Sequence, residues 1–170
     1  MNKILVFLSI ALFTACNSEG IVRITPEFET YSLIKAKGSP KLKKEGVYAY
    51  IKEYSNGQAE LRFRVQHVYV HNNWNDVYFD RIKYLINDTL IIKTLDEKHN
   101  DMLYFGFFKD VQWNDDIADE ELIKQIIGAR TAKIKYQREN PETADTRQIT
   151  ERERRNIELI YKFYFKKFAQ

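Results

Sequence analysis

Hydrophobic and polar residues alternate along much of the chain between residues 28 and 108, which is the pattern of half-buried β-strands. Asn56-Gly57 separates two of these alternating runs, and this dipeptide is a strong signal for a tight hairpin. Asn87-Asp88-Thr89 predicts a second turn. We therefore expect strands at residues 28–37, 46–54, 59–70, 77–86, 90–95 and 102–108.

The longest of these runs changes phase. Leu61, Phe63 and Val65 share one face of the predicted strand, whereas Val68 and Val70 fall on the other face. A shift of one residue in the alternation is typical of a β-bulge, which we place near Gln66.

The period becomes helical after residue 110. Asp115 or Asp116 is a suitable N-cap for a helix that runs to about Ile127 and ends at Gly128. A strand at 129–137 and a loop at 139–148 follow. Thr150 and Glu153 have the spacing of a capping box, and the helix that they begin extends to about Phe168.

The last helix is amphipathic, with a wide apolar face that is rich in aromatic residues. Leu159 and Phe163 lie on a flank of this face. Two interpretations stay open for them: another element of the same domain covers the flank, or the flank meets a partner or lipid headgroups.

These elements predict a mainly β protein of the α+β class. We expect an antiparallel β-sheet or sandwich with one internal helix and a C-terminal amphipathic helix, as one globular domain at residues 28–170. Its order of elements loosely resembles small envelope proteins of β-sandwich type. No Gly-rich phosphate loop is present, and we expect no cofactor.

The first twenty residues have the composition of an export signal. Lys3 precedes a short apolar run, and Phe13-Thr14-Ala15-Cys16 follows it, with the only cysteine of the chain. This tetrapeptide resembles the lipobox of bacterial lipoproteins. The resemblance implies cleavage after residue 15, a lipid anchor on Cys16, and a tether at 16–27. Asn17 in place of Asp implies sorting to the outer membrane.

Removal of the predicted leader takes away Lys3, which lowers the formal charge from +3 to +2. A chain so near neutrality is not expected to bind nucleic acid. The partners that we expect are the membrane, through the anchor, and an envelope protein or glycan.

One tripeptide occurs twice, as Trp74-Asn75-Asp76 and as Trp113-Asn114-Asp115. An indole ring beside short polar side chains suits a sugar ring or a peptide backbone, so these six residues are our candidate ligand-binding residues. The alternative is structural, because Asn and Asp also form turns and helix caps.

No catalytic motif stands out. His67 and His71 are four apart, but in a strand this spacing is too long for both to bind one metal, and we expect two half-exposed histidines and no metal site. Asp88-Thr89-Leu90 resembles an O-glycosylation site of bacterial envelope proteins, centred on Thr89; a plain turn is the alternative.

Three functions remain open. The first is a lipid-anchored, non-enzymatic binding module for a partner protein, a glycan or a peptidoglycan component. The second is an envelope hydrolase with an unidentified carboxylate site, and the third is a membrane-held inhibitor or immunity-type protein. Two converging carboxylates of raised pKa would favour the hydrolase, and an exposed patch with Trp74, Trp113 or Phe163 would favour binding.

Overall fold

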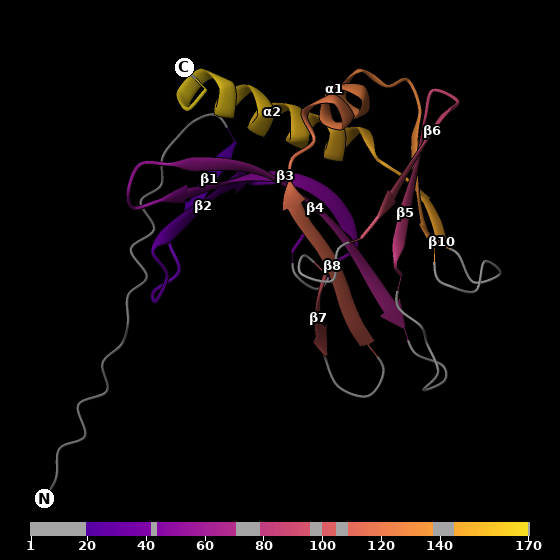
Figure 1. Cartoon of the computed structure of the whole chain (residues 1–170), viewed down its shortest axis with the longest axis horizontal. Helices are drawn as coiled ribbons and strands as arrows, with labels where there is room; N and C mark the ends of the chain where they lie inside the picture. The colour runs from indigo at the N-terminus through magenta and orange to yellow at the C-terminus, as the bar shows by residue number, and fades with distance from the viewer. Residues whose placement is uncertain are drawn as a thin grey trace, which may run out of the picture.

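Two antiparallel sheets and two helices surround one hydrophobic core in the computed structural model (Figure 1). The described residues are 20–41, 44–70, 79–95, 100–104, 109–137 and 145–169. The predicted fold class, α+β and mainly β with an internal helix and a C-terminal helix, is confirmed.

The large sheet has six strands in the order β1-β2-β3-β4-β8-β7. The strands are β1 (Ile21–Ile24), β2 (Tyr31–Ala36), β3 (Gly46–Tyr54), β4 (Ala59–Val70), β7 (Asn100–Tyr104) and β8 (Lys109–Ile117). The Asn56-Gly57 hairpin between β3 and β4 is confirmed. Gly57 has a φ of 87°, a backbone conformation that glycine adopts without strain.

The small sheet has four strands in the order β10-β9-β5-β6. Its strands are β5 (Arg81–Ile86), β6 (Thr89–Thr94), β9 (Ala132–Gln137) and β10 (Asp145–Gln148). Asn87 and Asp88 alone form the turn between β5 and β6, since Thr89 is already paired with Ile86. Both turn residues have positive φ, as a two-residue hairpin loop of type I′ requires.

Alternation along the strands gives each sheet an inner face toward the core and an outer face. On the large sheet the inner face carries Val47, Ala49 and Ile51 of β3, together with Leu61, Phe63 and Val65 of β4. On the small sheet it carries Ile82, Tyr84 and Ile86 of β5, together with Ala132, Ile134 and Tyr136 of β9.

The helices complete this core above the sheets (Figure 1). Helix α1 (Glu120–Gly128) buries Leu122, Ile123 and Ile126, and helix α2 (Glu151–Lys167) buries Ile157 and Ile160. The capping box predicted for α2 is present, with Thr150 as N-cap and Glu153 as its partner.

The predicted bulge near Gln66 is wrong. The register is unbroken from Gly46↔Gln66 along β3 and β4, and also from Arg62 to Val70 along β4 and β8. Beyond Gln66, β4 no longer pairs with β3 and continues beside β8 alone. Val68 there pairs with Val111, which is fully buried although it lies on the outer-face side. Both faces are buried here, since His67 and Gln112 on the inner face are buried as well. The apolar phase shifts because the inner-face positions become polar, and the backbone stays regular.

The predicted start of the internal helix is also wrong. Asp115 and Asp116 lie in β8, and the N-cap is Asp119, whose side chain accepts a hydrogen bond from the Leu122 backbone N–H. Asp115 is held by arginines of β4, and Asp116 forms an ion pair with Lys93 of β6. These cross-strand partners keep both carboxylates in the sheet.

Two further segments differ from their predictions. Within the predicted tether, residues 21–24 form β1 and pair with β2, which leaves Ile21 buried. Within the predicted loop at 139–148, residues 145–148 form β10 and pair with β9. Both strands have only four residues, too few for alternation to identify them.

Neither α1 nor α2, the helices of the described residues, is long and apolar enough to cross a bilayer.

Candidate functional site

Trp113, Asn114 and Asp115 occupy consecutive positions in the middle of β8. Their side chains therefore alternate: Trp113 and Asp115 lie on the outer face of the large sheet, and Asn114 is buried on the inner face. The expected ligand-binding group is thus divided between two faces. Trp74, Asn75 and Asp76 lie outside the described residues, so whether the two copies meet stays a prediction.

Trp113 and Asp115 belong to a group that we call the outer-face cluster. Register explains its composition, because Arg64 is paired with Tyr48 on one side and with Asp115 on the other, and Gln66 is paired with Trp113. The members of the cluster are Tyr48, Tyr50, Arg62, Arg64, Trp113 and Asp115.

Asp115 is the polar centre of the outer-face cluster. Its Oδ2 accepts a hydrogen bond from the Tyr50 hydroxyl at 2.5 Å and one from Arg64 Nη2 at 2.5 Å. Arg62 Nε lies 3.4 Å from Oδ1, and Arg62 Nη2 donates to the Asp115 carbonyl oxygen at 3.0 Å. The carboxylate side chain is only 13% exposed, so these charge-assisted bonds are partly shielded from water.

Three aromatic rings surround the Arg64 guanidinium. Its Cζ atom lies 6.0 Å from the ring centre of Tyr48, 5.4 Å from that of Tyr50 and 5.5 Å from that of Trp113. Distances of this size are typical of cation–π contacts. The Trp113 ring is therefore engaged by Arg64, whereas the sequence suggested a ring free to stack on a ligand.

Burial and charge act together on the ionisable groups of this cluster. Burial of Tyr50, reinforced by the adjacent Asp115 carboxylate, raises the pKa of its hydroxyl. Burial alone would lower the pKa of Arg64, but Tyr48 and Asp115 outweigh it and raise that pKa. Arg64 therefore remains a cation and Tyr50 a neutral donor, an arrangement suited to recognition by fixed hydrogen bonds and not to proton transfer.

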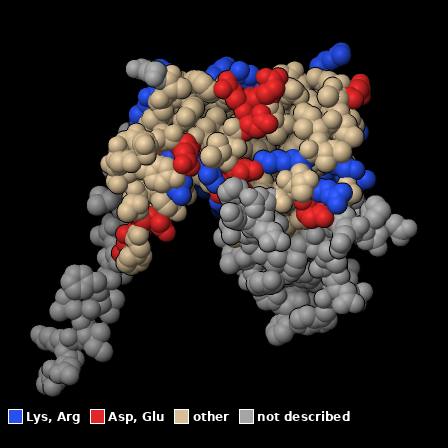
Figure 2. Space-filling model, in the orientation of Figure 1, with Lys and Arg blue, Asp and Glu red and all other residues tan. Residues whose placement is uncertain are grey.

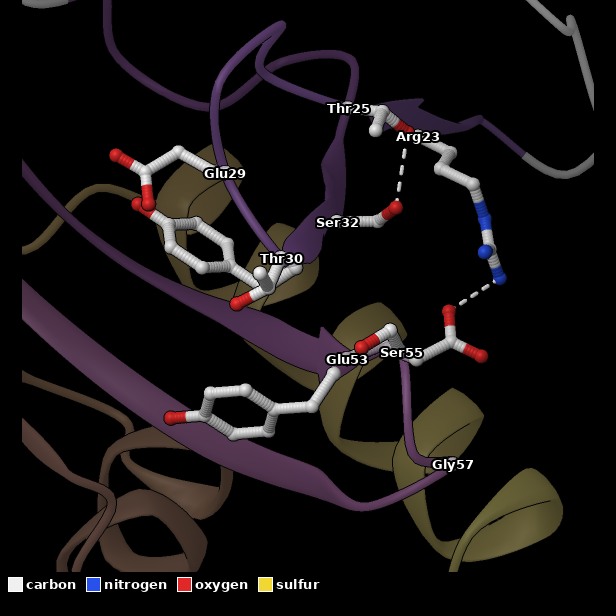
Figure 3. A pocket seen from close by; sticks show the side chains of 10 residues that line it. Arg23, Thr25, Glu29, Thr30, Ser32, Glu53, Ser55 and Gly57 are labelled. Carbon is white, nitrogen blue, oxygen red and sulfur yellow. Dashed lines mark hydrogen bonds and ion pairs between the residues drawn. The ribbon is translucent and has the colours of Figure 1, made fainter.

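A hollow of about 340 Å³ lies where β1 and β3 end and β2 begins (Figure 3). Arg23 and Glu53 meet across it at 2.5 Å, and the Thr25 and Ser32 hydroxyls are 2.8 Å apart. Lys167 of α2 reaches Glu53 as well, at 3.8 Å. The carboxylate is thus already paired with cations of this chain.

A second hollow, of about 450 Å³, is lined by residues that include Glu45, Arg147 and Glu153. Arg147 donates two hydrogen bonds to Glu153, at 2.9 and 3.0 Å, and its Nε lies 3.8 Å from Glu45. Burial favours the neutral form of Glu153, but the hydrogen bonds from Arg147 and from the Thr150 and Val47 backbone lower its pKa. A catalytic acid would need the opposite shift.

His67 is buried on the inner face beside the second hollow, whereas we expected a half-exposed side chain. Its ring stacks on Tyr136 at 4.3 Å, and its Nδ1 lies 2.8 Å from a Glu45 oxygen. His71 lies outside the described residues. Within the described part of the chain, no three His, Cys, Asp or Glu side chains lie together as a metal site would require.

Two other predicted positions have clear surroundings. Leu159 and Phe163 are partly buried and pack against the core, and Leu159 also lies near Gly20 at the start of β1. These contacts favour the interpretation that the domain itself covers this flank. Thr89 is exposed at the start of β6, and its glycosylation stays a prediction.

Sequence reasoning missed Tyr48, Tyr50, Arg62 and Arg64. The signal was present, because each pair has i, i+2 spacing and the Asn56-Gly57 hairpin brings the two pairs together. Cys16 lies outside the described residues.

Comparison with known proteins gave no match: no family model, no curated protein and no solved structure is significantly similar to the chain.

Proposed function

We propose that this chain is a lipid-anchored protein of the cell envelope whose folded domain is a non-enzymatic binding module. The location rests on the sequence Phe13-Thr14-Ala15-Cys16 and on the leader that precedes it. The sorting residue Asn17 favours the outer membrane. The ligand class is a partner protein, a glycan or a peptidoglycan component.

The observation that carries the binding proposal is the outer-face cluster. Arginine, tyrosine and tryptophan are the residue types most enriched at the energetic centres of protein interfaces. Here Arg62 and Arg64 hold one carboxylate, and three such rings surround Arg64, on the sheet face opposite to α2. Tyr48 and Tyr50 are buried, so the partly exposed Trp113, Arg62 and Arg64 are the members that a partner would contact. Their mutual contacts preorganise them, which lowers the entropic cost of binding.

The charge pairing supports binding over hydrolysis. Arg62 and Arg64 hold Asp115, and Arg147 holds Glu153 with a lowered pKa. A glycosidase-type site needs one carboxyl group that keeps its proton near neutral pH. No observation in the described residues favours that chemistry at either group.

Site-specific photo-cross-linking in intact cells tests this proposal. Ile117 is 64% exposed and is paired with Arg62 at the rim of the outer-face cluster, so a photoreactive residue there leaves the cluster intact. We expect Ile117 adducts with one protein or glycan species, and far fewer adducts from the same probe at Lys124 on α1. Equal labelling at both positions, or none at Ile117 in the folded, acylated protein, would refute the proposal.

A further inference from the structure

Strand β6 is the free edge of the small sheet. It is the last strand in the order β10-β9-β5-β6 and pairs only with β5 among the described strands. Edge strands carry a row of backbone N–H and C=O groups that another strand can bind, and proteins usually protect them.

The hairpin register shows which backbone groups of β6 face outward. Just after β6, the Leu95 N–H donates to the Asp80 carbonyl at 2.9 Å. Because hydrogen-bonded positions alternate along an antiparallel pair, the odd-numbered residues of β6 bond to β5 and the even-numbered residues do not. The N–H and C=O groups of Leu90 and Ile92 therefore point away from β5. Nothing in the described part of the chain donates to them or accepts from them.

The side chains at this edge lack the usual protection. Leu90 and Ile92 are 57% and 54% exposed, although they are aliphatic. The one lysine of β6, Lys93, points to the inner side and pairs with Asp116 of β8 at 2.6 Å. The described strand contains no proline and no bulge. Neither an edge charge nor a backbone irregularity therefore prevents another strand from pairing with β6.

We propose that the β6 edge binds β6 of a second copy of this chain, in antiparallel register around a two-fold axis at Ile91. In this register Leu90 lies opposite Ile92 of the second copy, and Ile92 opposite its Leu90. Both are hydrogen-bonded pairs, and each exchanges two N–H···O bonds. The two small sheets become one continuous sheet.

The sequence of β6 favours a second copy over another occupant. The strand is complementary to itself, since aliphatic residues meet aliphatic residues on both sides of the axis. No charged side chain lies on the outer side of β6, so two copies meet there without repulsion between like charges; the nearest cation on that face, Lys83, belongs to β5. The interface is small, so we expect dimerisation to depend on concentration.

Sedimentation equilibrium of the full chain in detergent, with two matched variants, tests this inference. Ile92→Lys places a charge at the free edge, whereas Leu85→Lys places the same charge on the same face one strand inward. We expect wild type and Leu85→Lys to dimerise alike and Ile92→Lys to raise the dimer dissociation constant at least tenfold. Circular dichroism checks that both variants fold. A wild type that stays monomeric at every concentration would overturn the inference, as would equal effects of the two variants.

Disulfide cross-linking tests the register itself. In a full chain with Cys16→Ala, Leu90→Cys and Ile92→Cys are made as separate proteins. Opposite residues of a hydrogen-bonded pair lie about 5.5 Å apart between Cα atoms, within disulfide range, whereas residues two positions out of register lie about 7–8 Å apart. We expect the mixture to cross-link and each protein alone to stay uncross-linked. Equal yields in all three samples would contradict the register. Neither test depends on the anchor or on the outer-face cluster, so either proposal can fail alone.

Discussion

Asp115 is the residue on which the outer-face cluster depends. One carboxylate compensates two half-buried guanidinium groups and also accepts the Tyr50 hydroxyl. Its loss would leave the Arg62 and Arg64 cations partly buried without their main counter-charge, which is more costly than the loss of an exposed ion pair.

We therefore predict that Asp115→Ala lowers the free energy of unfolding by about 2–3 kcal/mol, measured by urea denaturation. Glu60→Ala is the matched control, because Glu60 also pairs with Arg62, at 3.3 Å, but is the more exposed carboxylate. The control should cost less than about 1 kcal/mol. Equal losses for the two variants would show that Asp115 has no special role.

The candidate site could be predicted only in part from the sequence. The sequence pattern groups Trp113, Asn114 and Asp115 as one ligand-binding set, and their role in binding stays a prediction. The pattern does not reveal that they lie in strand β8, which turns Asn114 to the opposite face. Asp115 was expected to cap a helix because the sequence places it close before an apolar helical stripe. Its true partners, Arg62 and Arg64, are more than fifty positions away in sequence.

Among the elements, the β5–β6 hairpin shows how local chemistry fixes a register. Asn87 and Asp88 have φ values of 45° and 69°. The Asn87 side chain also accepts hydrogen bonds from the backbone N–H groups of Arg130 and Thr131, at 2.9 and 3.2 Å. The turn therefore positions β6 beside β5 and also fastens the segment that leads into β9.

Glycine substitutions separate these two roles. Asp88→Gly relieves a left-handed backbone conformation and should raise the free energy of unfolding by about 0.5 kcal/mol. Asn87→Gly is equally compatible with the turn but removes both side-chain hydrogen bonds, so it should lower stability by about 1–2 kcal/mol. Chemical denaturation of the two variants side by side measures the difference. Equal changes in the two would mean that the bonds to Arg130 and Thr131 contribute nothing.

Elements with a strong local signal were predicted well. The β3–β4 hairpin follows from Asn56-Gly57, and α2 follows from its capping box. Strand β8 was not recognised because its core-facing residues, Gln112, Asn114 and Asp116, are polar. A core-facing strand position is normally expected to be apolar, as in the first half of β4. Gln112 instead hydrogen-bonds the Phe79 backbone, a partner that no local pattern reveals.

At the scale of the whole molecule, Glu153 joins three parts of the fold. It lies in the first turn of α2, accepts from the Val47 backbone N–H in the large sheet at 2.9 Å, and pairs with Arg147 in the small sheet. The Thr150 backbone N–H donates to it at 2.8 Å. Glu151 and Glu153, the acidic residues of this first turn, also interact favourably with the positive N-terminal end of the helix dipole.

Helix α1 likewise begins with acidic residues, and Figure 2 shows a group of acidic side chains over it.

The contacts of Glu153 should make the free energy of unfolding depend on pH. Since the folded-state pKa of Glu153 is below its ordinary value of 4.5, its contribution is complete above that value and is lost as pH falls through the lower pKa. We predict that Glu153→Gln lowers the free energy of unfolding by about 2 kcal/mol at pH 7. In this variant the free energy of unfolding should also fall less steeply with decreasing pH below pH 4.5 than in the wild type. Glu151→Gln, at an exposed position of the same turn, is the control. An unchanged acid profile for Glu153→Gln would contradict the assignment.

The central proposal about the whole molecule is that a lipid on Cys16 attaches it to the membrane. Mass spectrometry of the intact protein, purified from envelopes of its native cells, tests it most directly. The account predicts a chain that begins at residue 16 and carries the added mass of a diacylglycerol and an amide-linked acyl group, with neither modification in Cys16→Ala. A chain that begins at Met1, or an unmodified Cys16 thiol, would contradict it.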